Sequence, residues 1–322
     1  RGSRIFEIRR YFNEIQFEIK NTRYYFDTNS NLSKASEANL NEPLIFSSEI
    51  KANNENSFLI EVDKLFLSES FYRIKNNRRG PIKLGKLNSG MSHYKGIYNY
   101  PKNTDIAVNL VYRNDYPKKG STSAIVDSRS ISISLRHSLV ELPDNDYQPR
   151  KSDPRVGFFM VYRDNMTTTD ILNYDDFICR WNLVKKNPEA KLTEPVTPIT
   201  YWLENTTPKE LIPVVKNGVL AWNKAFKKIG FKNAVEVKVQ PDTATWDAGD
   251  IRYNVIRWTS SPYPPFGGYG PSFTNPRTGE ILGADIMLEF VYLTNRLRSE
   301  TYYERAASSE DFDELSREDH FC

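Results

Sequence analysis

Histidine and cysteine, which supply much of the metal and nucleophile chemistry of proteins, are scarce in this sequence. Its 322 residues include 3 histidines and 2 cysteines, Cys179 and Cys322. One pair of cysteines is too few for the disulfide framework of a small secreted domain. We therefore expect two free thiols, with a single bridge in an oxidising compartment as the alternative.

Long apolar runs and an excess of one charge are also missing. No stretch approaches the roughly 20 apolar residues of a transmembrane helix, so we expect no membrane span. The formal net charge is only +3, and basic residues are interleaved with acidic ones, whereas nucleic-acid-binding proteins gather them into a patch. We therefore expect no nucleic-acid partner. A secretory signal is absent too. Because the sequence begins with Arg1 and not with an initiator methionine, and its last residues complete no recognisable element, we expect both ends to be cut.

The residues that are present indicate a globular, β-rich protein. A content of 39% hydrophobic and 26% charged residues is globular, and 13% aromatic residues favours strands. Apolar and polar residues alternate at residues 15–19, 58–62, 106–112 and 131–135. A period of two is typical of strands with one buried face. We predict an antiparallel β-rich module over residues 1–145, as a sheet, sandwich or open barrel.

The rest of the chain divides into a connecting segment and an α/β segment. Residues 146–197, rich in proline and charge, are predicted to be a linker and connecting segment. A helix is then predicted from a Thr207 cap to a left-handed Gly230, kinked or starting later because of Pro213. Strands are predicted at residues 199–203, 235–239, 251–258 and 280–290. Residues 198–322 therefore have the pattern of half of an α/β domain.

No motif of a common hydrolase occurs. H-E-x-x-H, which places two imidazoles on one helical face to bind zinc, is absent. We predict His93 at the surface and His137 on the apolar face of a strand, while His320 stands near the end. Gly-x-Ser-x-Gly is absent, and the glycines of residues 267–270 lack the lysine of a phosphate loop, so we interpret them as a turn with a close backbone approach. Paired glycosidase carboxylates stay open, because 41 acidic residues always include some pair.

Several segments, taken together and in their order, resemble a known family. They include His137-Ser138-Leu139-Val140, Asp153-Pro154-Arg155-Val156-Gly157, Glu194-Pro195-Val196-Thr197-Pro198, Trp222-Asn223-Lys224-Ala225-Phe226 and Asp250-Ile251-Arg252-Tyr253-Asn254. From about Phe71 to Phe290 the chain is similar to large bacterial zinc-dependent metalloproteases, which have a β-rich N-terminal module and a metzincin-like catalytic domain. Each segment alone is weak, but the set is specific.

The resemblance implies an α+β fold in which residues 198–322 are the N-terminal part of a metzincin-like peptidase domain. Its implied cofactor is zinc in the parent protein, its substrate a peptide or protein, and its location the bacterial cell envelope or the outside of the cell. The strand at residues 283–288 would form the upper edge of the cleft. A substrate would pair there with Gly283, Ala284, Asp285 and Ile286 by strand addition. An ordinary strand without a ligand is the alternative.

The zinc-binding H-E-x-x-H helix of the family follows that strand, and no residue here matches it. We therefore expect no catalytic residue and no metal ligand in this chain, and no peptidase activity from the chain alone. A non-catalytic module that binds a glycan or cell-envelope polymer through exposed aromatics stays open, as does a structural domain of a surface assembly. The residues encoded after Cys322 discriminate, because H-E-x-x-H within about a hundred residues favours the peptidase. Nothing in the sequence indicates the oligomeric state.

Overall fold

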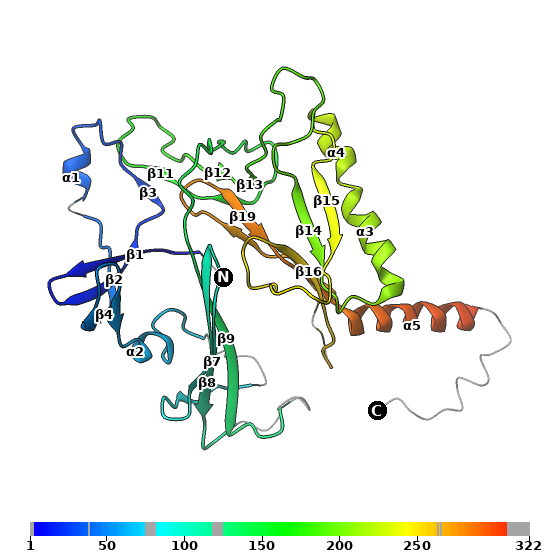
Figure 1. The fold of residues 1–322 in the computed structure, drawn as a ribbon, viewed down its shortest axis with the longest axis horizontal. Coiled ribbons are helices and arrows are strands. Elements are labelled where there is room, and N and C mark those ends of the chain that lie inside the picture. Colours follow the sequence, from blue (N-terminus) through cyan, green and yellow to red (C-terminus); the bar gives the residue numbers. More distant parts are fainter. Residues whose placement is uncertain are drawn as a thin grey trace. The chain divides into compact units, whose positions relative to one another are not determined.

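Figure 1 shows the chain in the computed structural model, which describes residues 3–37, 39–74, 82–117, 125–262, 264 and 266–307. The chain forms two compact units whose segments interleave in the sequence. The first unit consists of Arg1–Asn182, Gly249–Arg252 and Phe273–Gly283, and the second of Leu183–Ala248, Tyr253–Ser272 and Ala284–Cys322. The division therefore differs from the predicted boundaries at residues 145 and 197.

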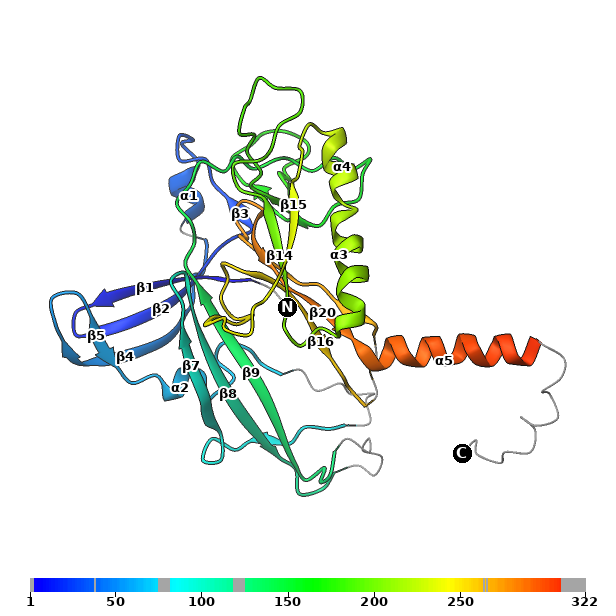
Figure 2. The ribbon, with the colours of Figure 1, turned by 45° about the vertical axis from the view of Figure 1, so that its right-hand side comes forward.

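Antiparallel sheets dominate the first unit (Figures 1 and 2). One has the strand order β1-β2-β4-β5, and in the other β8 pairs with β6, β7 and β9. The strands are β1 (Ile5–Tyr11), β2 (Glu14–Lys20), β4 (Leu44–Asn53), β5 (Phe58–Ile60), β6 (Lys86–Leu87), β7 (His93–Asn99), β8 (Asn103–Arg113) and β9 (Ser130–Val140). Each of the four alternating segments overlaps a strand, so the β-rich, antiparallel α+β class is confirmed.

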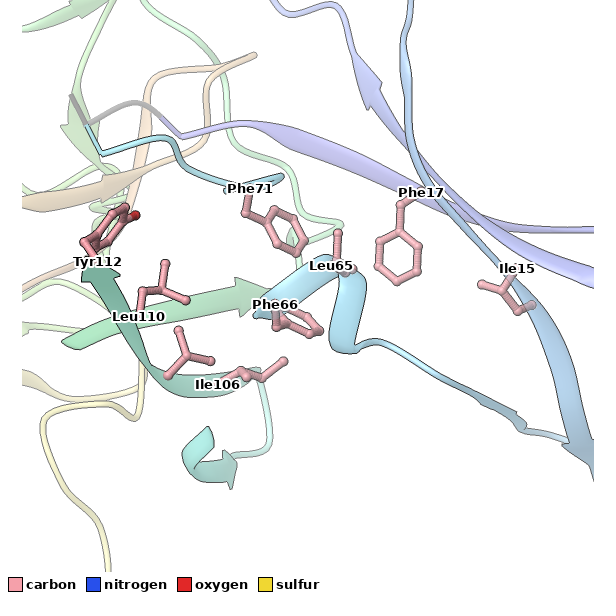
Figure 3. Close-up of a cluster of buried hydrophobic side chains, with 9 residues drawn as sticks. Ile15, Phe17, Leu65, Phe66, Phe71, Ile106, Leu110 and Tyr112 are labelled. Atoms are coloured by element: carbon pink, nitrogen blue, oxygen red, sulfur yellow. The ribbon is translucent and has the colours of Figure 1, made fainter. Parts of the chain in front are cut away.

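A short helix contributes the centre of this unit's core. α2 (Asp63–Phe66) places Leu65 and Phe66 between side chains of β2 and side chains of β8 (Figure 3). The buried cluster consists of Ile15, Phe17, Leu65, Phe66, Phe71, Ile106, Val108, Leu110 and Tyr112. Burial of one such side chain stabilises the fold by about 1.5–3 kcal/mol. The alternation in β2 and β8 thus directs both apolar faces toward one core.

The segment predicted as a linker belongs to the first unit as far as residue 182. Tyr147, Phe177 and Ile178 are buried in it, which an extended surface linker would not allow. Short ladders hold the segment: β3 (Tyr24–Tyr25) with β11 (Asp164–Asn165), β10 (Met160–Val161) with β12 (Phe177–Ile178), and β13 (Arg180–Trp181) with β19 (Glu280–Ala284), which also pairs with β18 (Ser272–Thr274). The unit also contains α1 (Ser33–Glu37).

A sheet of mostly parallel strands forms the second unit. Its order is β15-β14-β16-β20-β17, in which the first four strands run parallel and β17 runs antiparallel to β20. The strands are β14 (Ile199–Leu203), β15 (Val235–Val239), β16 (Asn254–Thr259), β17 (Gly268–Tyr269) and β20 (Ile286–Glu289). Buried aliphatic residues in β14, β15 and β16 suit a parallel sheet that is covered on its faces.

The predicted helix before β15 has three pieces, and its α-helical part begins after Thr207, which is the later start that Pro213 had suggested. They are the 3₁₀ turn η1 (Lys209–Leu211), α3 (Ile212–Leu220), which packs against β15, and α4 (Asn223–Lys228). Pro213 lies in the first turn of α3, where its missing N–H costs no hydrogen bond. Thr207 is buried and does not cap the helix, so that prediction was wrong. Gly230 does follow α4 with a φ of +91°, as predicted.

The strand predicted at residues 280–290 is two strands and the start of a helix. β19 ends at Ala284, β20 begins at Ile286, and α5 (Phe290–Ala307) follows β20 directly (Figure 2). None of the described helices combines the length and the apolar character that a membrane crossing requires.

Candidate functional site

The edge of the second unit's sheet is the first place to look for a ligand site. Parallel strands place their carboxyl ends at one side of a sheet, and the outermost strand presents backbone groups to a partner. β17 is the outermost strand on one side of this sheet and β20 is its inner neighbour. The predicted substrate strand therefore lies one position inside the edge.

Gly283, Ala284, Asp285 and Ile286 lie at the junction of two strands. The first two end β19, Asp285 belongs to neither strand, and Ile286 begins β20. In register, Ile286 is opposite Ile256 of β16. The structure thus places the four residues next to one another, but without the single continuous strand that the sequence predicts.

Groups of this junction hold the sheet together. The Ala284 amide donates to Asn254 Oδ1 at 2.9 Å, and Asp285 Oδ1 accepts the Val255 amide at 3.0 Å. The Asp285 amide donates to the Pro271 carbonyl at 3.2 Å. The expected free edge at residues 283–286 was therefore wrong: Ala284 and Asp285 already bind β16 and the segment beside β17, and β20, which begins at Ile286, lies between these two strands.

The outward-facing groups of the edge come instead from Gly268. The Glu289 amide donates to the Gly267 carbonyl at 3.0 Å, so Gly267 faces β20, as Pro271 also does. Gly268 is opposite Leu288. Because successive residues of an antiparallel strand alternate in the direction of their N–H and C=O groups, those of Gly268 point away from β20. Its exposed position makes them accessible to a peptide backbone.

Sequence reasoning missed β17 because two residues give no alternation to read. The signal was the glycine run at residues 267–270, which we interpreted as a turn with a close backbone approach. The close approach is present: a Cβ on Gly267 would lie 2.7 Å from the Tyr292 ring. The turn was wrong, because Gly268 and Tyr269 form a strand.

A buried carboxylate fixes the end of β20 beside this edge. Glu289 is 2% exposed. Its Oε1 accepts the Ser261 amide at 2.9 Å and the Val291 amide at 3.3 Å, and its Oε2 accepts the Thr259 and Ser261 hydroxyls, each at 2.8 Å. Burial alone would raise the pKa of Glu289, but these hydrogen bonds outweigh it and hold the pKa below its usual value. Glu289 therefore stays ionised and anchors the start of α5.

A second carboxylate at this side of the sheet, that of Glu204, is also engaged. Glu204 follows β14 and its Oε1 lies 3.0 Å from an Arg257 guanidinium nitrogen, while the Thr206 hydroxyl donates to Glu204 Oε2 at 2.7 Å. Glu289 and Glu204 therefore hold the sheet together, and what this edge offers a ligand among the described residues is its backbone.

The histidines are not brought together. His93 is exposed at the start of β7, as predicted. His137 lies on the apolar side of β9, with its ring 5.8 Å from that of Phe66 and 5.5 Å from that of Phe71. Burial lowers the pKa of His137. His320 lies outside the described residues, so the two that are described act as a surface residue and a core residue.

The thiol of Cys179 is free and partly buried. Burial raises its pKa, and a hydrogen bond with Thr274 only partly offsets this, so it is not an activated nucleophile. Cys322 lies outside the described residues.

Comparison with models of protein families gives a match. The model of the domain of unknown function DUF5117 matches residues 3–186, which is more than half of the chain. No curated protein and no solved structure matches.

Proposed function

We propose that this chain, which belongs to the family defined by the domain of unknown function DUF5117, is part of a zinc-dependent metalloendopeptidase and holds a peptide substrate along β17. The resemblance of its sequence to bacterial metalloproteases supports the class of enzyme. The same resemblance supports a location in the bacterial cell envelope or outside the cell. The binding role rests on the outward backbone groups of Gly268 at the edge of the sheet.

Strand addition suits this edge. An extended peptide that pairs with an edge strand gains main-chain hydrogen bonds that do not depend on its sequence. Gly268 has no side chain to obstruct a second backbone, and its partner on the inner side, β20, is fixed by Glu289. A rigid inner strand keeps the edge in a binding-competent geometry, which lowers the entropy cost of association.

Zinc is the metal that the resemblance implies, and it would activate water for peptide hydrolysis. A catalytic zinc site uses three protein ligands, commonly histidine with glutamate. Within the ranges that the structure describes, no group of three His, Cys, Asp or Glu side chains could hold a metal ion. The described residues do not fit the metal, so the proposal assigns them substrate binding and no step of hydrolysis.

A matched pair of variants tests the binding role. Gly268→Pro removes the outward N–H and spares the bonds to β20, since proline is accepted in edge strands where its nitrogen faces away from the sheet. Gly268→Ala keeps the N–H and adds the same Cβ, 3.1 Å from the Met287 carbonyl oxygen. We expect proline to weaken binding of labelled oxidised insulin B chain, measured by fluorescence anisotropy, by roughly fivefold relative to alanine, the value of one net hydrogen bond. Equal affinities, or no binding by the wild type, would refute the role of β17.

The enzyme class is tested on the protein as it is encoded in full. Hydrolysis of fluorescent casein should stop with the chelator phenanthroline and return with added zinc. The 322 residues alone should bind no stoichiometric zinc in calorimetry and cleave no casein. Absence of chelator-sensitive hydrolysis by the full protein would overturn the class without affecting the peptide-binding result.

A further inference from the structure

A small cavity in the first unit lies among the ladders of residues 150–178. Lys151 bridges to Phe177, and Met160 pairs with Ile178, so β12 has a strand-like neighbour on each side. The Ser152 amide donates to the Asp176 carbonyl at 2.7 Å. This backbone network holds the walls of the cavity with main-chain hydrogen bonds.

The cavity is lined by both apolar and polar residues, and we refer to the polar ones, Lys151, Ser152, Asp175 and Asp176, as its rim. Its volume is about 150 Å³, and Pro154, Met160 and Tyr174 give it apolar lining. Lys151 and Asp175 are also part of the lining and form an ion pair, with Lys151 Nζ 2.5 Å from Asp175 Oδ1. Pockets for drug-sized ligands are about 300–1,000 Å³, so this one fits a single ring or side chain.

The rim contains both donors and acceptors of hydrogen bonds. The Arg163 amide donates to Asp176 Oδ1 at 3.0 Å, which orients that carboxylate. A carboxylate accepts about four hydrogen bonds and an ammonium donates three, so Asp175, Asp176 and Lys151 have capacity beyond these contacts. Ser152 adds a hydroxyl to the lining.

Four exposed tyrosines lie on or next to the short ladders that include the lining residues Met160 and Tyr174. Tyr24 and Tyr25 form β3, which pairs with Asp164 and Asn165 of β11, and Asp164 also bridges to Tyr174. The exposed fractions are 43% for Tyr24, 37% for Tyr25, 58% for Tyr162 and 51% for Tyr174. Tyrosine presents a rigid ring and a hydroxyl at a low entropy cost, which suits recognition of polar ligands.

One of these tyrosines is held by a stacked arginine. The Arg163 guanidinium carbon lies 3.6 Å from the ring centre of Tyr25 and 5.0 Å from that of Phe177. Cation–π contacts with two rings restrict the position of the guanidinium. The backbone amide of Arg163 also orients Asp176, so one residue contacts both Tyr25 and the rim.

We propose that this cavity binds one sugar residue of a neutral glycan, with Tyr174 against the C–H face of the ring and Lys151, Asp175 and Asp176 on its hydroxyls. Hydroxyls donate and accept, so they use both kinds of group on the rim. A basic side chain would be repelled by Lys151, and an anion would be repelled by the two carboxylates. An aliphatic side chain would bury the polar groups of the rim without hydrogen bonds, which costs free energy. The site is independent of the edge strand β17 and of the peptidase proposal.

Calorimetry with neutral oligosaccharides tests the site. Maltohexaose, cellohexaose, xylohexaose, mannohexaose and chitohexaose are titrated into the 322-residue chain, and at least one of them should bind. Tyr174→Ala should weaken that binding by about tenfold, as expected for the loss of an aromatic contact, and Asp175→Asn should weaken it too. Tyr116→Ala is the matched control, because Tyr116 is 92% exposed and does not line the cavity. It should bind like the wild type.

Three results would overturn the proposal. They are no binding by any of the five sugars, equal binding by Tyr174→Ala and the wild type, and Tyr174-dependent binding of an oligolysine peptide in place of the sugars. The last result would assign the cavity to a protein partner. Gly268→Pro should bind sugar normally, so failure here is distinct from failure of the peptide-binding role.

Discussion

Replacing Glu289 by glutamine and by methionine separates the two pairs of hydrogen bonds that hold the end of β20, which come from Thr259 and Ser261 at the end of β16 and from Val291 in α5. One carboxylate oxygen accepts the backbone amides of Ser261 and Val291, and the other accepts the hydroxyls of Thr259 and Ser261. Amides cannot change their direction, whereas hydroxyls can rotate to accept a hydrogen bond. The two substitutions should therefore differ in cost.

Glutamine keeps an oxygen for the amides and offers its NH₂ to the hydroxyls. It loses the charge of the acceptor, and we expect this to cost roughly 1 kcal/mol. Methionine has a similar length and accepts only weakly, so it leaves two amides unsatisfied in a site that is 2% exposed. An unsatisfied buried donor costs about 1–3 kcal/mol. Glu289→Met should thus be the less stable variant by at least about 1 kcal/mol.

Urea denaturation of the wild type and both variants at neutral pH measures these differences. The pKa of Glu289 in the fold is below its ordinary value of 4.5, so the carboxylate stabilises the wild type above that pH and loses this contribution as the pH falls through the lower, folded pKa. The gap between wild type and Glu289→Gln should therefore shrink in acid. Methionine and glutamine variants of equal stability would refute this account of the junction.

The remaining predictions concern the first unit. Burial lowers the pKa of His137 from 6.5 in the fold, so as the pH drops below 6.5 the unfolded chain takes up a proton first and the free energy of unfolding falls. In urea denaturation at a series of pH values, His137→Leu should reduce this fall. An unchanged dependence of the unfolding free energy on pH would contradict the prediction. Phe12 has a φ of +49°, which is unfavourable for a bulky residue, so Phe12→Asn should raise the unfolding free energy by up to about 1 kcal/mol, and a lower melting temperature would count against this. A chain of residues 1–186 lacks the segments 249–252 and 273–283 of this unit. Because the unit is then incomplete, the backbone amides of β8 should exchange hydrogen with solvent faster than they do in the whole chain. Equal protection of these amides in the two chains would show that the two segments are dispensable for the unit's stability.

Local pattern predicted the long strands and one helix end. Apolar and polar residues alternate in β2, β8 and β9 because one face of each strand packs on other residues of the unit. The burial that stabilises these strands can therefore be predicted from the sequence. Gly230 was predictable for a different reason, since only glycine adopts a φ of +91° without strain.

Pairings between distant segments were not predictable in this way. Arg180 pairs with Glu280, and Trp181 with Ile281, but β13 consists of these two residues alone and is too short to show a period. The same holds for β17, whose position decides which strand forms the edge of the second sheet. The break at Asp285 was hidden because its carboxylate binds the Val255 amide, a contact that depends on the fold and not on neighbouring residues.

Buried carboxylates show why acidic residues were uninformative in the sequence and are informative in the fold. Asp105 and Asp250 are each 1% exposed, and Glu280 and Glu289 are 5% and 2% exposed. Each is satisfied by groups of its own unit: Arg136 lies 2.8 Å from Asp105, Arg252 lies 2.6 Å from Asp250, and Asn145 donates to Glu280 at 2.9 Å. A buried charge costs much less free energy when its partners are in place than when one is missing. Asp105 and Glu280, whose partners are distant in the sequence, therefore disfavour any other pairing of the segments that carry them. Their burial therefore specifies the fold, and a search for catalytic carboxylates in the described residues should begin among the exposed ones.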